Sequence, residues 1–215
     1  MSAAATAGAV QPGQHQSNVY LTFDDGPDAD WTPRVLDMLA AARVPATFFM
    51  IGRSAQALPG LVRRVLAEGH AIGNHTWSHR HPLAMSTRQA REEVRSGAQA
   101  LADVLGCPVK FYRPPHGRVR QCMVDEAARL GQSLVLWTLS AVDWGPFGSS
   151  RAIAGRLRRT EAEDIVLMHD GSRGINRTAE LFKVLPQFMA DLRHRGLQAG
   201  LPAQTARIRT SLASR

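Results

Sequence analysis

The stretch YLTFDDGPDADW, residues 20–31, ends an apolar run with two adjacent carboxylates, Asp24 and Asp25, before a Gly-Pro break. Consecutive side chains of a strand point to opposite faces, so two acids at a strand end point apart. The Gly-Pro pair favours a turn directly after them. This geometry suits two acids with different tasks. A solvated strand end followed by a turn would explain the same letters without any function, and the two interpretations stay open at this point.

Apolar runs of strand length recur along the chain, and each is followed by a helical pattern. The runs are NVYLTF, ATFFMI, HAIGNH, VKFYR, SLVLWTL and DIVLMH. Apolar spacing predicts helices over residues 32–42, 55–68, 87–105, 120–131, 149–160 and 177–195. Strands that alternate with helices pair in parallel, and strands that are apolar on both faces agree with a sheet covered on both sides. The sequence therefore predicts an α/β fold with a parallel sheet.

Polar side chains stand where these predicted strands end. They are Asp24, Asp25, His75, Arg113, Asp143, Trp144, His169 and Asp170. In a parallel βα barrel the carboxyl ends of the strands share one face, and active sites are built on that face. We therefore expect these residues to meet at one end of the sheet.

The composition limits the classes of protein to which the chain can belong. The chain has 215 residues, 44% of them hydrophobic, which suffices for the core of one large domain. Its 26 basic and 18 acidic residues give a net charge of +8, but no block of consecutive basic residues occurs. We therefore expect a solvated, arginine-rich surface and no nucleic-acid partner, with an acidic substrate as the minor alternative. Cys107 and Cys122 bracket KFYRPPHGR, where a disulfide would brace the loop, but two free thiols are the favoured expectation.

The two ends of the chain are predicted to be tails around one domain at residues 19–205. Residues 1–18 lack the basic region and the sustained apolar core of a signal peptide, and residues 206–215 are polar. No stretch of the sequence is predicted to span a membrane. The expected location is cytoplasmic by default, and extracellular or periplasmic if a leader has been removed. The oligomeric state is left open.

The segment GNHTWSH places His75 and His79 four residues apart, on one face if the segment is helical or turning. Such a pair is often incidental, and the neighbouring His81 shows how common histidine is in this region. With one aspartate, however, the pair forms a two-histidine, one-carboxylate set that leaves coordination positions open for water and substrate. This donor set is typical of a catalytic metal rather than of a closed structural site.

From about Val19 to Leu197 the sequence carries TFDDGP, HTWSH, RPPHG, DW and LMHD in that order. These segments resemble the five motifs of the polysaccharide deacetylases, carbohydrate esterase family 4, also called the NodB homology domain. The resemblance implies a distorted (β/α) barrel and metal-dependent removal of acetyl groups from glycans. It also implies that Asp25, His75 and His79 hold one divalent metal ion, with Zn²⁺ favoured over Co²⁺ or Ni²⁺. Asp24 is then the general base, which gives the two adjacent acids separate tasks.

The remaining motifs imply further roles. His169 is the expected proton donor, Asp143 its partner, and Arg113 the partner of the base. Trp144 and Leu167 are expected to wall the pocket for the acetyl methyl group. His116 is expected to bind substrate through its main-chain N–H, at a position where the family often has tyrosine. Ser140 stands where many members have aspartate, and both departures put the choice of substrate in doubt.

The predicted activity is de-N-acetylation of N-acetylglucosamine-containing glycans, such as chitooligosaccharides or peptidoglycan, with release of acetate. One alternative is another amide, imide or O-acetyl ester hydrolase on the same scaffold, because fold and metal site alone do not fix the substrate. Another is a catalytically silent glycan-binding module. The retention of base, acid and all three metal ligands argues against a silent module.

Overall fold

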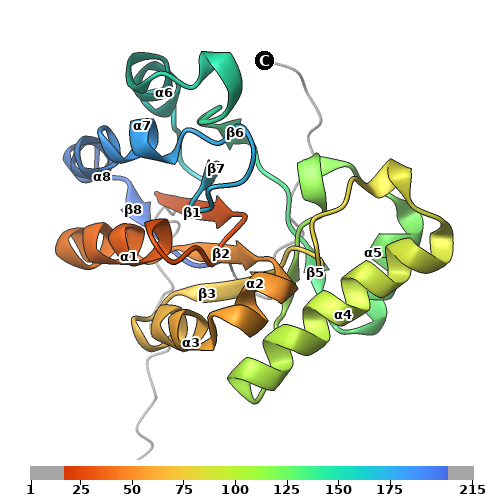
Figure 1. Cartoon of the computed structure of the whole chain (residues 1–215). Helices are drawn as coiled ribbons and strands as arrows, with labels where there is room; N and C mark the ends of the chain where they lie inside the picture. The colour runs from red at the N-terminus through yellow and green to blue at the C-terminus, as the bar shows by residue number, and fades with distance from the viewer. Residues whose placement is uncertain (1–16, 203–215) are drawn as a thin grey trace, which may run out of the picture.

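The computed structural model describes residues 17–202, with helices arranged around a central sheet (Figure 1). The predicted tails, 1–18 and 206–215, lie outside these residues apart from the start of the first strand. Residue 205, the predicted end of the domain, also lies outside them. The bounds 19–205 therefore stay a prediction.

The central sheet is 8-stranded, and every pairing in it is parallel. The strands are β1 (Asn18–Asp24), β2 (Thr47–Met50), β3 (Ala71–Asn74), β4 (Phe111–Tyr112), β5 (Ser133–Leu134), β6 (Leu139–Ser140), β7 (Ile165–His169) and β8 (Gln198–Ala199). Their order is β5-β4-β3-β2-β1-β7-β6, with β8 beside β1. Read from β6 through β7 and β1 to β5, this is the cyclic order of a (β/α) barrel. Among the described strands, β5 and β6 do not pair, so the structure confirms the predicted distorted (β/α) barrel.

The register of the parallel strands places the motif residues at the same end of the sheet. Asp24, the last residue of β1, pairs with His169 of β7. Asn74 of β3 pairs with Tyr112 of β4, so the residues that follow them, His75 and Arg113, leave the sheet side by side. The carboxyl ends of these parallel strands thus meet at one edge, as the sequence predicts.

Helices cover the outside of the sheet (Figure 1). They are α1 (Trp31–Ala42), α2 (Gly52–Ala57), α3 (Pro59–Ala67), α4 (Thr87–Leu105), α5 (Gln121–Arg129), α6 (Ser150–Leu157), α7 (Thr178–Phe182) and α8 (Leu185–His194). The predictions of single helices over 55–68 and 177–195 were wrong, because each region holds two helices. Pro59 and Pro186 lack a backbone N–H and are tolerated only in a first helical turn, so each lies in the first turn of a new helix.

The core lies on both faces of the sheet. On one face Phe23 and Phe48 stack with ring centroids 5.2 Å apart and pack against Leu36 and Leu39 of α1. On the other face Phe49, the next residue of β2, packs in a separate apolar cluster. This double-sided burial explains why the strand sequences are apolar throughout instead of alternating.

The predicted strand SLVLWTL is split into β5 and β6, and the prediction of one continuous strand was wrong. Between the two halves, the carbonyl oxygens of Val135 and Leu136 accept hydrogen bonds from the guanidinium of Arg113, at 3.0 Å and 3.1 Å. A buried carbonyl must find a donor, and here a side chain provides it in place of a neighbouring strand. Arginine therefore occupies the point where the ring of strands is open.

Asn74 and Gly97 fix the chain just before His75. The Asn74 amide donates to the carbonyl of Val94 at 2.9 Å, and its oxygen accepts from the Thr76 N–H at 3.0 Å. Helix α4 approaches this turn through Gly97, where an added Cβ would lie 2.4 Å from the Asn74 side-chain oxygen and 2.6 Å from the Thr76 carbonyl carbon. The glycine therefore permits the contact that holds this strand end.

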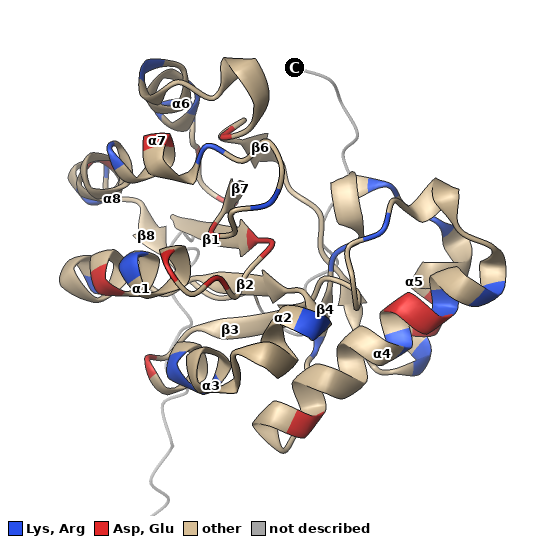
Figure 2. Ribbon diagram, in the orientation of Figure 1, with Lys and Arg blue, Asp and Glu red and all other residues tan. Residues whose placement is uncertain are grey.

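No helix within residues 17–202 has the length and apolar character needed to cross a membrane. Arginine and lysine residues are distributed over helices on several sides of the sheet (Figure 2). Cys107 is exposed and Cys122 half-buried, and both are free thiols, as expected.

We predict opposite effects for two glycine-to-alanine substitutions in helices. Gly97→Ala should lower the free energy of unfolding by about 1–3 kcal/mol, because the methyl group has no room against Asn74 and Thr76. Gly155→Ala in α6 is the matched control, because nothing lies within 4 Å of its added Cβ. It should raise stability by about 0.5–1 kcal/mol through helix propensity. Denaturant unfolding of both variants measures the difference, and equal stabilisation would contradict the packing argument.

Candidate active site

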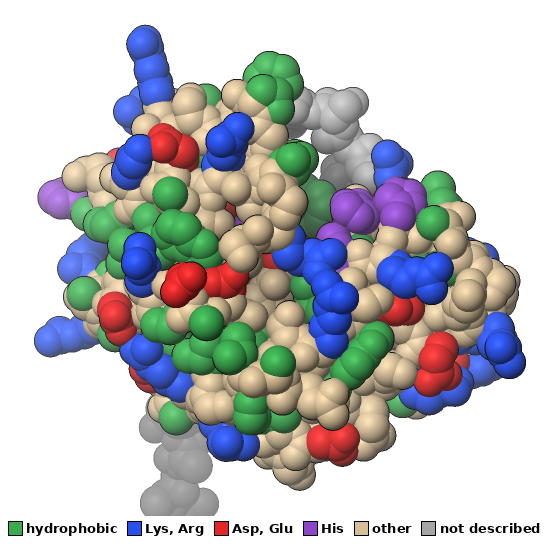
Figure 3. Space-filling model, in the orientation of Figure 1, with side chains coloured by type: hydrophobic (Ala, Val, Ile, Leu, Met, Phe, Trp, Pro, Cys, Tyr) green, Lys and Arg blue, Asp and Glu red, His purple; other side chains and the backbone are tan. Residues whose placement is uncertain are grey.

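A cavity of about 420 Å³ opens at the carboxyl ends of the strands. Every predicted site residue except Arg113 and Asp143 lines it. Those two residues are fully buried behind the lining, and each is bonded to a lining residue. In the space-filling view, histidine side chains gather beside a hollow in the surface (Figure 3). The structure thus brings together all of the residues that the motifs single out.

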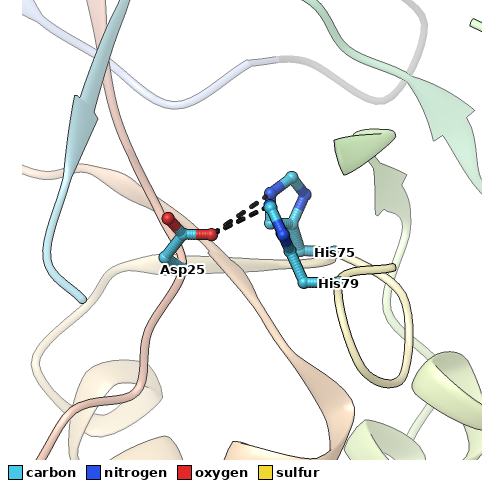
Figure 4. A group of neighbouring side chains, drawn as sticks. All are labelled: Asp25, His75 and His79. Carbon is cyan, nitrogen blue, oxygen red and sulfur yellow. Dashed lines mark ion pairs between the residues drawn. The ribbon is translucent and has the colours of Figure 1, made fainter. Parts of the chain in front are cut away.

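Asp25, His75 and His79 point toward one another (Figure 4), with one possible ligand atom from each lying within 4.8 Å of the others. Asp25 Oδ1 is 3.8 Å from His75 Nε2 and 3.1 Å from His79 Nε2. Asp25 and His79 have positive φ angles of 77° and 60°, which few residues other than glycine adopt. Such backbone strain is found most often at functional sites. The turns after β1 and β3 therefore aim these side chains at a common point.

His75 is held in one tautomer. Its Nδ1 lies 2.7 Å from the carbonyl oxygen of Arg113, which can only accept, so Nδ1 carries the proton. The lone pair is then on Nε2, the atom that faces Asp25. Metal-binding histidines are oriented in this way by a partner on the other ring nitrogen.

The two oxygens of Asp25 have different surroundings. Oδ2 accepts a hydrogen bond from the Asn176 amide at 2.8 Å. Oδ1 is buried and accepts no hydrogen bond from any residue in the described range. Burial opposes ionisation of Asp25, but the charges of His169, His79 and His75 and the Asn176 hydrogen bond hold its pKa below the ordinary value. The carboxylate therefore keeps its charge and directs one unpartnered oxygen toward the two histidines.

Burial, together with the neighbouring His75, lowers the pKa of His79 to about 3. The ring is therefore neutral near pH 7, and its Nε2 lies 3.1 Å from Asp25 Oδ1. Two imidazoles and one carboxylate that converge in this way form a donor set that fits a divalent cation.

Asp24 lines the same cavity as Asp25 and is bound by Arg113, so the two acids do not point fully apart as the strand pattern predicts. The guanidinium donates to Asp24 Oδ1 at 2.7 Å and to Thr22 Oγ1 at 2.8 Å. It is completely buried and lies 4.0 Å from the centroid of the Phe49 ring. Arginine keeps its charge even when burial lowers its pKa, as here, with the Asp24 charge acting in the other direction. Asp24 Oδ2, which lies 3.6 Å from His75 Nε2, remains on the cavity side.

His169 is held by Asp143 at both its ring and its backbone. Asp143 Oδ1 lies 2.8 Å from His169 Nδ1, and Oδ2 accepts from the His169 N–H at 2.8 Å. Burial lowers the pKa of His169, but the charge and hydrogen bond of Asp143 outweigh it, with help from Asp25 and Asp24, and raise it to about 9. The imidazole is therefore protonated at neutral pH, next to a carboxylate that keeps Nδ1 in its donor state.

The three residues expected to bind substrate also line the cavity. Trp144 stands edge-on to His169 with centroids 5.3 Å apart, and Leu167 is a buried residue of β7. His116 has a φ of 57°, which the proline ring cannot adopt. His116→Pro would therefore distort the loop as well as remove its N–H, so it cannot serve as a clean test of that donor.

Asp170, noted in the sequence without a role, is structural. It is completely buried and accepts a hydrogen bond from Thr32 Oγ1 at 2.6 Å. Burial first, and then the charges of Asp25 and Asp24, raise its pKa to about 7. A Cβ on Gly26 would lie 2.4 Å from its carboxylate, so this contact requires the glycine of TFDDGP.

Sequence reasoning missed further residues that line the cavity, among them Trp137, Arg173 and Asn176. Trp137 lies in the segment between β5 and β6, which the sequence predicts as regular strand. Arg173 and Asn176 lie in the loop after β7, outside every motif. Their only signal in the sequence is that this loop follows a strand end, where residues of a barrel approach the site.

A family model described as polysaccharide deacetylase matches residues 11–135 of the chain. A peptidoglycan-N-acetylglucosamine deacetylase of Bacillus cereus is 37% identical over 172 residues, covering 79% of this chain and 80% of that protein. A second Bacillus cereus protein of the same name is 33% identical, but this chain spans only 64% of its length. A chitooligosaccharide deacetylase of Sinorhizobium fredii is 38% identical over 157 residues, which cover 72% of each chain.

The fold is similar to that of a family 4 carbohydrate esterase from Streptomyces lividans in complex with acetate. The two structures share a TM-score of 0.80 and 30% sequence identity. The similarity covers 88% of this chain and 94% of the other.

We predict that Asn176→Leu weakens binding of a divalent ion, because it removes the hydrogen bond that orients Asp25. The expected loss in affinity for Zn²⁺ is about 10–100-fold, whereas His79→Ala, which removes a ligand, should abolish stoichiometric binding. Ser172→Ala is the matched control, because Ser172 lies in the same loop but bonds to Asp28 instead. Calorimetric titration of the purified variants measures these affinities. Wild-type affinity in Asn176→Leu would contradict the prediction.

Proposed function

The chain belongs to the polysaccharide deacetylase family, and from this premise we propose that it hydrolyses the acetamide group of N-acetylglucosamine-containing glycans and releases acetate. One observation carries the proposal. A carboxylate held by a cation, Asp24 with Arg113, and an imidazolium held by an anion, His169 with Asp143, face the same cavity as the candidate metal ligands. Amide hydrolysis needs a group that takes a proton and another that gives one.

Asp24 is the proposed general base. Arg113 binds its Oδ1, which leaves Oδ2 on the cavity side to accept a proton from the attacking water. The hydrogen bond from the buried guanidinium holds the carboxylate in one orientation, with Oδ2 free of Arg113. The oxygen of that water then forms a bond to the acetyl carbon.

His169 is the proposed general acid. The amide C–N bond breaks with its electron pair on nitrogen, and this nitrogen must gain a proton to leave as an amine. His169 supplies that proton, since its raised pKa of about 9 keeps it protonated at neutral pH. Asp143 holds Nδ1 in its donor state throughout, so the proton that leaves comes from Nε2. The products are acetate and the free amino sugar.

We propose Asp25, His75 and His79 as the ligands of one divalent ion, with Zn²⁺ as the first candidate. Zn²⁺ favours histidine nitrogen and carboxylate oxygen, and three protein ligands leave a position open, as in catalytic zinc sites. Co²⁺ and Ni²⁺ accept the same donors. The ion would supply Lewis-acid polarisation of the acetyl carbonyl and a lowered pKa for bound water.

Trp144 and Leu167 form the proposed apolar wall for the acetyl methyl group. Both line the cavity, and Trp144 lies directly beside His169. An apolar wall next to the proton donor would place the methyl group against carbon atoms and the amide nitrogen toward the imidazole. His116, which packs against His79 and has a positive φ, is proposed to contact substrate through its main chain.

The test is an acetate-release assay on chitooligosaccharides, peptidoglycan and acetylxylan, with and without added Zn²⁺ or Co²⁺. Acetate from the N-acetylated glycans supports the proposal. Release from acetylxylan alone would favour O-acetyl ester hydrolysis instead. Binding without acetate release would favour a silent glycan-binding module.

We predict that Asp24→Asn keeps the divalent ion and loses about 10²–10⁴-fold in kcat, because a general base acts on protons rather than on coordination. Metal content by plasma spectrometry and acetate release together check this outcome. Asp37→Asn, at an exposed carboxylate of α1, is the control for loss of one charge and should behave as wild type. If Asp24→Asn empties the metal site, the two adjacent aspartates have been assigned in reverse.

We predict that Asp143→Asn moves the alkaline limb of the kcat–pH profile to lower pH. A proton donor must be protonated, so activity is retained below the pKa of His169, about 9, and lost as the pH rises through it. Removing the Asp143 charge lowers this pKa toward the ordinary value of about 6.5. An alkaline limb unchanged in position would rule out His169 as the titrating acid.

A further inference from the structure

The loop Gly171–Arg177 after β7 forms one side of the cavity and is held firmly in place. Asp28 accepts hydrogen bonds from the Ser172 N–H at 3.1 Å and from its hydroxyl at 2.6 Å. The Ile175 carbonyl accepts from the Gly145 N–H at 2.8 Å, and Asn176 is bonded to Asp25. Arg173 lies between these anchors. Its backbone is therefore fixed relative to the candidate metal ligands.

The Arg173 side chain is half-buried and lines the cavity. Within residues 17–202 its guanidinium has neither a carboxylate partner nor a hydrogen bond. Two carboxylates of the site are already engaged, since Asp24 is bound by Arg113 and Asp143 by His169, and a third, Asp25, is a candidate metal ligand. An anionic ligand that entered the cavity would give this guanidinium a charged, hydrogen-bonding partner.

Arg173 shares the cavity lining with His79, His116 and Asn176, and none of these side chains can form an ion pair with it. Arginine presents a planar fork of donors that matches a carboxylate, so the ligand chemistry that fits this corner is a carboxylate group.

We propose that Arg173 binds a carboxylate carried by the glycan close to the reacting acetamide, so that the enzyme prefers an anionic glycan to a neutral one. The proposal rests on the deacetylase function proposed above and specifies its substrate class. The carboxylate of the acetate product has the same chemistry and could also bind Arg173. The test therefore distinguishes a carboxylate on the glycan from acetate.

The test compares three substrates: a disaccharide of N-acetylglucosamine and a sugar bearing a lactyl ether carboxylate, its methyl ester, and neutral chitotetraose. The wild type should show a kcat/KM about 10–100-fold higher for the acid than for the ester, the range of one charge-assisted hydrogen bond. Arg173→Gln should remove this preference and leave turnover of the ester and of chitotetraose within about twofold of wild type. Arg173→Lys should keep part of the preference. Arg63→Gln, an exposed arginine of α3, is the control and should keep all of it.

Several outcomes would overturn the inference. One is equal kcat/KM of the wild type for acid and ester, and another is an equal loss on all three substrates in Arg173→Gln. If Arg173→Gln instead relieves inhibition by acetate while the preference for the acid persists, the carboxylate is the product and not the glycan. Turnover of chitotetraose reports on the deacetylase function separately, so failure of one proposal is distinguishable from failure of the other. Calorimetric binding of acid and ester to Asp24→Asn gives a second readout that needs no turnover.

Discussion

The ion pair between Arg113 and Asp24, buried at the centre of the barrel, is the interaction on which the site depends. Removing the Asp24 side chain would leave the completely buried Arg113 guanidinium without its carboxylate partner, which is strongly unfavourable in a protein interior. Arg113 also binds the carbonyl oxygens of Val135 and Leu136, which have no strand beside them. A single side chain therefore completes the barrel wall and orients the proposed base. The barrel wall and the proposed base thus depend on the same set of hydrogen bonds, those of the Arg113 guanidinium.

A second ion pair, Asp143 with His169, mirrors the first with the charges exchanged. In one pair a cation orients a carboxylate, and in the other an anion favours a protonated imidazole. Between them lie Asp25, His75 and His79, which fit a divalent ion. Each proposed proton-transfer group is thus held by a partner that lies behind the cavity lining and does not occupy it.

Sequence patterns predicted the parallel sheet and the meeting of Asp24, His75, Arg113 and His169, because strand ends and motif order are both local properties. They missed the division of SLVLWTL, since the hydrogen bonds that interrupt this strand come from Arg113, which is distant in sequence. They also missed Arg173 and Asn176. A loop residue reveals its contacts only when the elements on both sides have been placed, and no spacing rule connects Asn176 to Asp25.

The opening of the barrel between β5 and β6 has a consequence for engineering. The carbonyls of Val135 and Leu136 are tied to Arg113, while the next residue, Trp137, projects into the cavity without belonging to a strand. A residue that takes no part in strand pairing, such as Trp137, can be substituted without a change in strand register. Position 137 is thus a place where the cavity wall can be altered without a change in strand register, and because the Arg113 guanidinium lies 5.7 Å from the Trp137 ring centroid, such a change also reaches the support of Asp24.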